Sequence, residues 1–407
     1  MNRLLFFLFI ILSIIFTPNF GALDRATVQW FFLSIVPLIY FRLIFFKNVT
    51  NFIYILYCLF IVQVFLSLFY SNNISISIID FSRHLSLFLL FVILINYFKS
   101  AKFSFLSISA IIAFFLLVES IISLLPLFSY IFKNGFSFSN ISSVDLNQFK
   151  GITGNRNITT ASIVIKFPFL FYYLFRSKNL FKPFISILSL LPLLSLFIIN
   201  SRAALLSFFF SIILYTLYFI IYKRTKFQNA LYLYLSIAIS YFFSYLILPS
   251  KSLQTAQRLS SITLTNDSSS QRFFLWQNAF SYISENLFIG CGIGNWKVES
   301  AAYWGSLGSS YLVPYHAHND FLEFATELGI FGGLTYLIIF IAVLFTYFKL
   351  FLIQKDFKFL VLFLSFTAVF VDSFLNFPFE RPIIMTMFVL LLALAVQFNS
   401  HKIDEKI

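Results

Sequence analysis

Long apolar runs separated by short polar segments make up most of the chain. Hydropathy marks roughly twelve runs of about 20 residues, the length that crosses the hydrocarbon core of a bilayer. Because the runs are continuous and do not alternate strictly, they predict helices and not the strands of a closed barrel. We therefore expect an all-α polytopic membrane protein. The predicted spans lie near residues 3–18, 27–46, 51–70, 84–98, 104–131, 158–176, 180–199, 203–222, 229–248, 328–348, 359–375 and 382–398.

The charged residues indicate how these spans are oriented. The chain is 60% hydrophobic and 11% charged, with a formal net charge of +13. Its basic residues gather in every second turn of the twelve-span order, which predicts a cytoplasmic face for those turns and for both termini. Because this distribution follows the topology, the excess charge does not indicate a nucleic-acid partner. The basic turns read FRLIFFKN, YFKSAK, FRSKNLFK, YKRTKF and KLFLIQKDFK.

The sequence predicts one membrane domain over residues 1–407. The first apolar run is followed by residues 17–20, Thr-Pro-Asn-Phe, and not by a small-residue cleavage site, so we expect a retained helix and not a signal peptide. Two cysteines are too few for a disulfide framework or a four-ligand zinc site. On the outer face the topology leaves residues 132–157, the turn 200–202 and a large loop at about 249–327, between the ninth and tenth helices.

The outer loop is expected to contain amphipathic helices. In SSSQRFFLWQNAFSYI the apolar residues Phe273, Trp276, Phe280 and Ile283 follow helical spacing, and Arg272 lies in the first turn. Such a helix fits the membrane surface, with Arg272 as a snorkelling anchor, and it equally fits the roof of a cavity. The nearby glycines in GCGIGNW, residues 290–296, lack the spacing of a phosphate-binding loop and predict a helix stop followed by a tight turn.

Two further arginines stand at the outer ends of predicted spans. Arg202 follows an apolar run in INSRAALLSF, where a charge is costly unless it has a partner, and Arg156 lies in GITGNRNITTAS before the sixth helix. Snorkelling to lipid headgroups is the alternative for Arg202, and a plain turn is the alternative for Arg156. Guanidiniums that converge on one cavity would suit a diphosphate, because each offers a planar fork of donors and could replace a metal ion in neutralising charge.

The segment YHAHNDFLEFATELGIFGG, residues 315–333, concentrates titratable groups in an otherwise apolar chain. His316 and His318 could join Asp320 as metal ligands on an extended segment, but the pattern does not match H-E-x-x-H. From His318 onward the spacing predicts a helix with a polar stripe of Asp320, Glu323 and Glu327. His318 at the start of a helix would favour the neutral imidazole and could accept a proton from a hydroxyl. A structural histidine that bonds a loop carbonyl is the alternative.

These motifs resemble the bacterial O-antigen ligase and polymerase superfamily. Its ligases share His, then Asn, Ser or Gln, nine residues, Gly, two residues, and Gly, Thr or Tyr. The chain has His318, Asn319, DFLEFATEL, Gly329, IF and Gly332 in this order. The twelve-span layout and the large loop before the tenth helix are also similar to the family, and so are Arg202 in NSRAALL and Arg272 in QRFFLW.

The resemblance implies a GT-C-like, metal-independent, inverting glycosyltransferase of the bacterial inner membrane with its active site facing the periplasm. The donor would be a glycan on undecaprenyl diphosphate, bound by Arg202 and Arg272, and the acceptor a hydroxyl of the lipid A core. His318 would be the general base. The resemblance also implies that Asn319 of the motif binds a substrate. Arg156 is a further residue that would bind substrate by this resemblance, although the family often has proline at the corresponding position. No cofactor or metal is implied, and the partners beyond the substrates are membrane lipids.

Three other activities fit the same sequence. An O-antigen polymerase would extend lipid-linked repeats, and a protein O-oligosaccharyltransferase would glycosylate proteins. The match to the His-Asn motif favours the ligase. A transporter or flippase would bind the diphosphate with the same arginines without chemistry, but it would not need His318, and the sequence shows no internal repeat of the kind that many transporters have.

Overall fold

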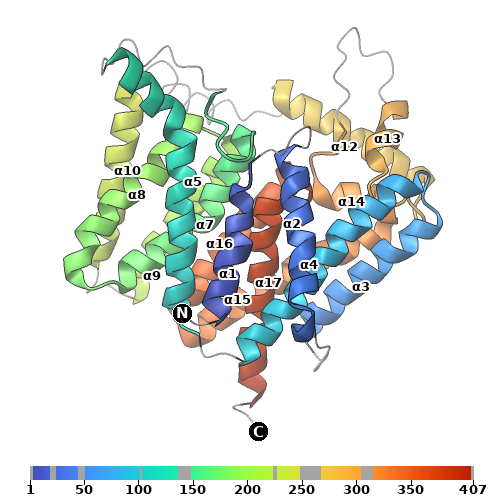
Figure 1. Ribbon diagram of the computed structural model, residues 1–407, viewed down its shortest axis with the longest axis horizontal. Coiled ribbons are helices and arrows are strands. Elements are labelled where there is room, and N and C mark those ends of the chain that lie inside the picture. The colour runs from blue at the N-terminus through green and yellow to red at the C-terminus, as the bar shows by residue number, and fades with distance from the viewer. Residues whose placement is uncertain are drawn as a thin grey trace. The chain divides into compact units, whose positions relative to one another are not determined.

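The computed structural model describes residues 3–18, 24–44, 51–100, 103–135, 148–222, 227–247, 267–303 and 315–404. Every regular element in these ranges is a helix, and they contain no strand (Figure 1). The predicted all-α fold is therefore confirmed. The α-helices are α1 Arg3–Ser13, α2 Arg25–Ile39, α3 Phe52–Leu66, α4 Ile74–Ser100, α5 Phe105–Asn134, α7 Arg156–Arg176, α8 Lys182–Ile199, α9 Arg202–Tyr222, α10 Phe227–Ile247, α12 Asp267–Glu285, α13 Trp296–Glu299, α14 Asp320–Leu328, α15 Ile330–Gln354, α16 Phe357–Leu375 and α17 Pro382–Asp404.

The apolar helices match the predicted spans closely. Within the described ranges ten helices are long and apolar enough to cross a membrane, and α1 and α2 are shorter apolar helices. The chain is therefore a multi-pass membrane protein. Several predicted turns fall partly outside the described residues, among them the outer segment 132–157, the basic turns near 45–50 and 223–226, and parts of the loop 249–327.

Helix α4 is longer than predicted. Hydropathy places a span at 84–98, whereas the helix begins at Ile74. The polar residues that weaken the hydropathy signal are accommodated inside the protein: Asp80 and His84 are buried, and Arg83 forms an ion pair with Asp80 at 2.7 Å. A charge that is paired within the protein does not end a membrane helix.

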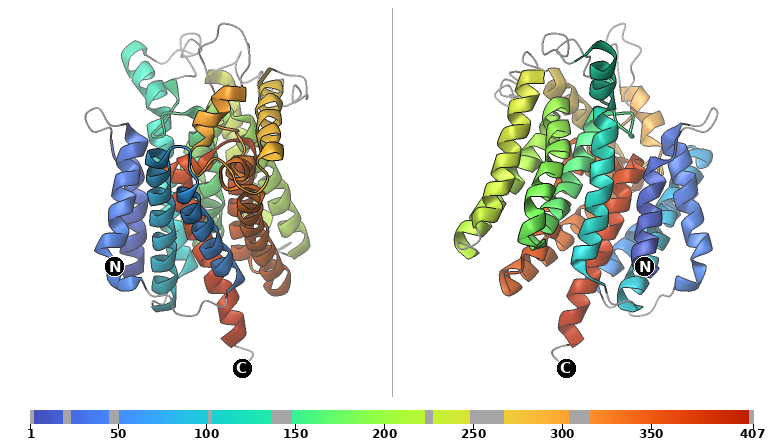
Figure 2. Two further views of the ribbon diagram at one scale, coloured as in Figure 1. Left: turned by 90° about the vertical axis from the view of Figure 1, so that its right-hand side faces the viewer. Right: turned by 60° about the vertical axis from the view of Figure 1, so that its left-hand side comes forward.

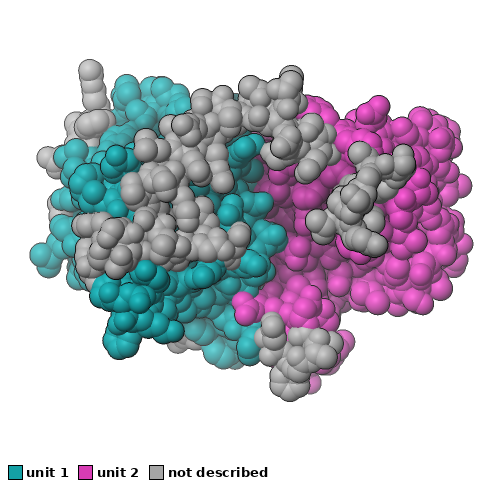
Figure 3. Space-filling view, turned by 90° about the horizontal axis from the view of Figure 1, so that it is seen from above, with its two compact units in different colours: residues 1–18, 103–262, 348–369 teal, residues 19–102, 263–347, 370–407 magenta. Residues whose placement is uncertain are grey.

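The chain divides into two compact units, coloured separately in Figure 3. Unit 1 comprises Met1–Pro18, Phe103–Ile262 and Phe348–Val369. Unit 2 comprises Asn19–Lys102, Thr263–Tyr347 and Phe370–Ile407. Helices α15 and α16 each contribute residues to both units.

Unit 1 is a bundle of helices. Helix α5 packs on α1, α7 and α8, α8 also packs on α10, and α7 packs on α9 (Figure 2). A buried ion pair joins two of these helices, since Lys166 Nζ of α7 lies 2.6 Å from Glu119 Oε2 of α5. Both side chains are at most 2% exposed, and Ser162 Oγ also donates to Glu119 Oε2. Each charge can be buried because the other compensates it.

Unit 2 is built around α4. This helix packs on α2, α3 and α17, while α12 packs on the short helix α14. Phe60 of α3, Phe324 of α14 and Tyr336 of α15 form edge-to-face and tilted ring pairs with centroids 4.5–5.1 Å apart. Aromatic packing therefore fixes α14 against the membrane helices.

The buried pair in unit 1 gives a test of the packing. Lys166→Met leaves the Glu119 charge without its partner, so we expect the free energy of unfolding to fall by about 3–5 kcal/mol. The double substitution Lys166→Met with Glu119→Met should recover most of this loss, because no charge then remains buried. Thermal unfolding in detergent micelles measures both variants. Equal melting temperatures for the single and the double variant would contradict the pairing.

Candidate functional site

The motif around His318 forms α14 and both of its ends. Asn319 is the N-cap, and its Oδ1 accepts hydrogen bonds from the backbone N–H groups of Phe321 and Leu322 at 3.0 and 3.1 Å. The nine residues that follow are the nine residues of α14. Gly329 then ends the helix with φ +77°, a conformation that favours glycine. The motif spacing therefore encodes one short helix with its start and its stop.

The glycine-rich turn at residues 290–296 holds the other end of α14. Backbone N–H groups of Cys291 and Gly292 donate to the carbonyls of Thr326 and Glu327 at 3.0 and 2.9 Å. The last carbonyls of a helix accept no hydrogen bond from within the helix. The N–H groups of this turn therefore supply the missing donors at the end of α14. Helix α12 ends at Glu285, five residues before the turn. The predicted tight turn at the glycines is confirmed, whereas the helix stops before them and not at Gly290.

The predicted polar stripe of α14 is not exposed. Asp320, Glu323 and Glu327 are 0%, 1% and 1% exposed. Glu323 accepts from the backbone N–H of Ala317 at 2.9 Å, and Glu327 accepts from the backbone N–H of Trp296 at 3.2 Å. Burial, followed by the nearby charge of Glu323, raises the pKa of Asp320 and Glu327 well above the usual range. Glu323 and Glu327 therefore anchor the surrounding loops to α14.

His318 lies one residue before the N-cap in the left-handed region, with φ +53°. Its ring is partly buried and packs edge-on against Phe377, with centroids 4.9 Å apart. Its Nδ1 is buried and makes no hydrogen bond within the described part of the chain. Burial, then the positive charge of Arg272 and that of His316, lower the pKa of His318 to about 4. The imidazole is thus neutral at ordinary pH and able to accept a proton.

His316 packs on the same phenylalanine in a different way. Its ring stacks on Phe377 with centroids 4.3 Å apart, and its Nδ1 lies 2.7 Å from Glu323 Oε1. Burial lowers the pKa of His316, but the charge and hydrogen bond of Glu323 outweigh it, and the pKa is raised. His316 therefore favours the protonated imidazole, whereas His318 favours the neutral one. Across the described ranges no three His, Cys, Asp or Glu residues are grouped to hold a metal ion.

Arg272 lies in the same part of unit 2 as His318. Its Nη2 donates to Asn376 Oδ1 at 3.4 Å, and Asn376 Nδ2 donates to Asp372 Oδ1 at 2.6 Å. These two hydrogen bonds orient the Arg272 side chain toward the protein. The charge of Arg272 also lowers the pKa of His318. Arg272 therefore has a hydrogen-bond partner inside unit 2, which a snorkelling anchor would not need. Sequence reasoning did not find Asp372 and Asn376, which lie about 100 residues further along the chain.

The buried face of α12 differs from the predicted one. Leu275, Ala279, Tyr282 and Ile283 are buried, whereas Phe273 and Phe280 of the predicted stripe are 44% and 57% exposed. The spacing predicts an amphipathic helix correctly, but contact with α14 selects a neighbouring face.

Arg156 and Arg202 are the first residues of α7 and α9 in unit 1. Asn155 caps α7 through Oδ1, which accepts from the backbone N–H of Asn157 at 2.9 Å. Helices α7 and α9 are in contact and run in the same direction, because α8 returns between them. The two arginines therefore stand at the same end of unit 1.

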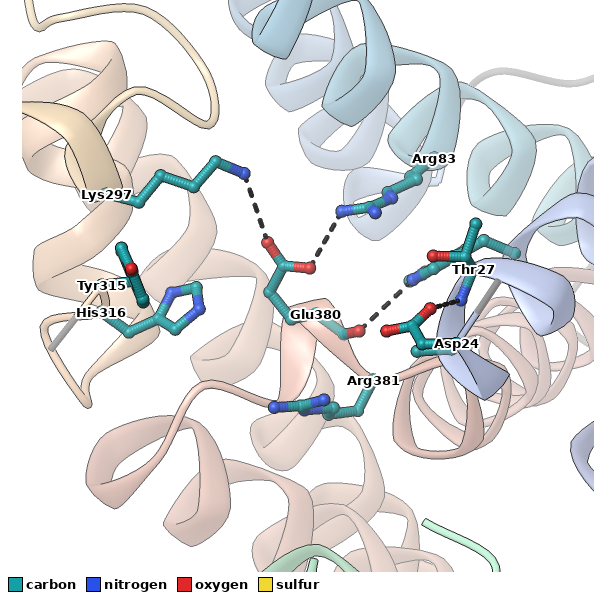
Figure 4. Close-up of a pocket in the computed structure, with 10 residues that line it drawn as sticks. Asp24, Thr27, Arg83, Lys297, Tyr315, His316, Glu380 and Arg381 are labelled. Atoms are coloured by element: carbon teal, nitrogen blue, oxygen red, sulfur yellow. Dashed lines mark hydrogen bonds and ion pairs between the residues drawn. The ribbon is translucent and has the colours of Figure 1, made fainter. Parts of the chain in front are cut away.

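A charged pocket of about 370 Å³ lies beside His316 in unit 2 (Figure 4). Its lining includes Arg83, Lys297, Glu380 and Arg381. Arg83 Nη1 contacts Glu380 Oε2 at 2.9 Å, and Lys297 Nζ lies 4.0 Å from Glu380 Oε1. None of these four residues was predicted from the sequence. Charges inside α4 and in the FPFERP turn between the last two spans were the available signal.

The cap at Asn319 can be tested by substitution. Asn319→Ala removes the acceptor for two backbone N–H groups, so we expect the free energy of unfolding to fall by about 1 kcal/mol. Asn319→Ser keeps a capping oxygen and should retain most of it. Asn134→Ala, at the exposed end of α5, is the control. Thermal unfolding that shows Ser to be as damaging as Ala would speak against the capping role.

Comparison with known proteins places this geometry in context. The family model Wzy_C, described as O-antigen ligase, matches residues 187–337, whereas no curated protein matches the chain. The matched range includes the two predicted diphosphate-binding arginines and the whole of α14. It indicates a membrane enzyme of the glycosyltransferase type. The match confirms the predicted resemblance, and it places the segment that carries Arg202, Arg272 and His318 in the O-antigen ligase superfamily.

Proposed function

We propose that this protein is an O-antigen ligase, which transfers a glycan from undecaprenyl diphosphate to a sugar hydroxyl of the lipid A core. The observation that carries the proposal is His318, whose buried Nδ1 makes no hydrogen bond to the described residues and whose pKa is low. This neutral imidazole stands beside Arg272 within the family-matched segment. A general base can take the proton of the acceptor hydroxyl, and a guanidinium can stabilise the leaving diphosphate, so the two together suit glycosyl transfer.

In the proposed reaction the acceptor hydroxyl attacks the anomeric carbon of the donor sugar. His318 takes the hydroxyl proton as the new carbon–oxygen bond forms, and the bond to the diphosphate oxygen breaks on the opposite side. Undecaprenyl diphosphate leaves, and the anomeric configuration inverts. The low pKa of His318 keeps the imidazole available as a base, although a base of low pKa depends on good positioning for its rate.

The guanidiniums serve the leaving group in this proposal. Arg272 and Arg202 bind the diphosphate and stabilise the charge that develops on it, without a metal ion. Asn376 and Asp372 hold Arg272 in position, which reduces the entropy lost when the donor binds. Arg156 stands at the same end of unit 1 as Arg202 and is a further candidate for the donor. Asn319 contributes mainly through the cap that fixes the residue before it.

The proposal also includes the location of the enzyme. The basic turns predict that the site faces the periplasm, with both termini in the cytoplasm and the protein in the inner membrane. One membrane domain over residues 1–407, with the loop 249–327 outside, stays a prediction. The GT-C-like classification likewise rests on the resemblance.

His318→Ala should abolish glycan transfer, because it removes the proton acceptor, while the protein still inserts and melts normally. The assay uses purified protein in proteoliposomes with undecaprenyl-diphosphate glycan and lipid A core, and it follows products by gel mobility. His401→Ala, near the end of α17, is the matched control. Transfer by His318→Ala at the wild-type rate would refute the role of base.

The same wild-type assay separates the other activities. Glycan attached to the core identifies a ligase. Longer lipid-linked glycan with untouched core identifies a polymerase, and labelled protein acceptor identifies a protein O-oligosaccharyltransferase. Movement of the donor across the bilayer without a new bond identifies a transporter.

Arg272→Lys should raise the KM for the lipid-linked donor roughly tenfold, the effect of about 1.4 kcal/mol expected when one charge-assisted hydrogen bond is lost. Lysine keeps the charge but cannot offer two parallel donors to a diphosphate. Arg176→Lys, whose exposed side chain pairs with Asp356 at 3.7 Å, is the control. An unchanged donor KM would return Arg272 to the role of a membrane anchor.

A further inference from the structure

Arg381 differs from the other cations of the charged pocket because its side chain forms no hydrogen bond or ion pair within the described residues. Arg83 Nη1 lies 2.7 Å from Asp80, and Lys297 Nζ lies 3.3 Å from the same carboxylate. Both also face Glu380. The guanidinium of Arg381, by contrast, forms no hydrogen bond or ion pair to a described residue, and its Nε is buried without an acceptor. Figure 4 draws no interaction from this side chain.

A partly buried arginine without an ion-pair partner among the described residues is suited to bind an anionic ligand. Arg381 is partly buried in the turn before α17, and its guanidinium lies over the ring of Phe377 at 5.1 Å. Burial lowers the pKa of Arg381, and the charges of Glu380 and Asp24 only partly offset that effect. Leaving buried N–H donors without acceptors costs free energy, which an incoming anion would recover. A guanidinium fixed on an aromatic ring is also preorganised to bind one.

The position of Arg381 indicates which substrate it serves. Phe377 is contacted by His318 at its edge, by His316 on its face and by Arg381. Arg381 and His316 both line the charged pocket, whereas the lining of this pocket does not include Arg272 or His318. Arg381 therefore shares a pocket with His316 and not with Arg272. If Arg272 binds the donor diphosphate, Arg381 lies where it could bind the acceptor substrate.

We propose that the charged pocket is an acceptor subsite in which Arg381 binds a phosphate group carried by the acceptor saccharide. This inference rests on the proposed function. A volume of about 370 Å³ suits one phosphorylated sugar unit and is too small for a long glycan. Arg83 and Lys297 hold the carboxylate of Glu380, which leaves the fork of Arg381 open to the phosphate. The subsite would align the acceptor hydroxyl with His318.

A binding experiment tests the subsite without requiring transfer. The full-length protein in nanodiscs of zwitterionic lipid is titrated calorimetrically with glucose 6-phosphate, glucose and inorganic phosphate. We expect glucose 6-phosphate to bind at least tenfold more tightly than the other two probes. Arg381→Gln should weaken that binding about tenfold, Arg381→Lys should weaken it less, and Arg176→Gln should not change it. Equal affinity in wild type and Arg381→Gln would overturn the proposal.

A second arm separates an acceptor phosphate from a lipid phosphate. The titration is repeated in nanodiscs that contain an anionic phospholipid. Unchanged binding of glucose 6-phosphate supports a saccharide site. Loss of that binding, together with inorganic phosphate binding as tightly as the sugar phosphate in zwitterionic lipid, would assign the pocket to a headgroup and overturn the acceptor role. Melting temperatures of the Arg381 variants check that they fold.

Transfer kinetics then connect the subsite to the reaction. For the wild type, phosphatase treatment of the acceptor should raise its KM about tenfold, while for Arg381→Gln it should have no effect, and the donor KM should be the same in both. Equal transfer to both acceptors by the wild type would overturn the inference and leave the ligase function intact. Binding of the sugar phosphate through Arg381 without any glycan transfer would support the subsite and refute the ligase function.

Discussion

The candidate site depends on the hydrogen bonds that complete both ends of α14. A helix of nine residues is too short to be stable alone, and its terminal N–H and C=O groups cannot be buried without partners. Asn319 supplies the acceptor at the start, and the backbone of Cys291 and Gly292 supplies donors at the end. Glu323 extends this network to His316 and Ala317. The position of His318 follows from this arrangement, because it immediately precedes the cap.

Elsewhere in the interior, basic side chains are paired with acidic ones. Lys166 is compensated by Glu119, and Arg83 by Asp80, as burial of a charge requires. His318 Nδ1 and Arg381 Nε are among the buried polar atoms that have no hydrogen-bond partner in the described residues, as are both carboxyl oxygens of Asp320. Departures from complete polar satisfaction are expected where a protein binds or transforms a ligand. The side chains of His318 and Arg381 both contact Phe377, so this ring lies between the proposed base and the proposed phosphate-binding arginine.

The family motif has a structural meaning in this protein. Its first two residues are the candidate base and the N-cap, its nine variable positions are the length of α14, and its glycines permit the turn into α15. The resemblance indicates the class of enzyme. The proposed chemistry, however, rests on the site, because helical membrane folds host enzymes and transporters alike.

The sequence by itself determined the membrane helices, the helical stretch around Trp276, the glycine turn and the start of a helix near His318. These features are local, since hydropathy, helical periodicity and turn chemistry act over a few residues. The tertiary structure decided the early start of α4, the buried face of α12 and the burial of the acidic stripe of α14. It also decided the partners of Arg272 and the isolation of Arg381. Those outcomes depend on contacts between segments far apart in the chain, such as Arg83 with Glu380, and no local pattern encodes them.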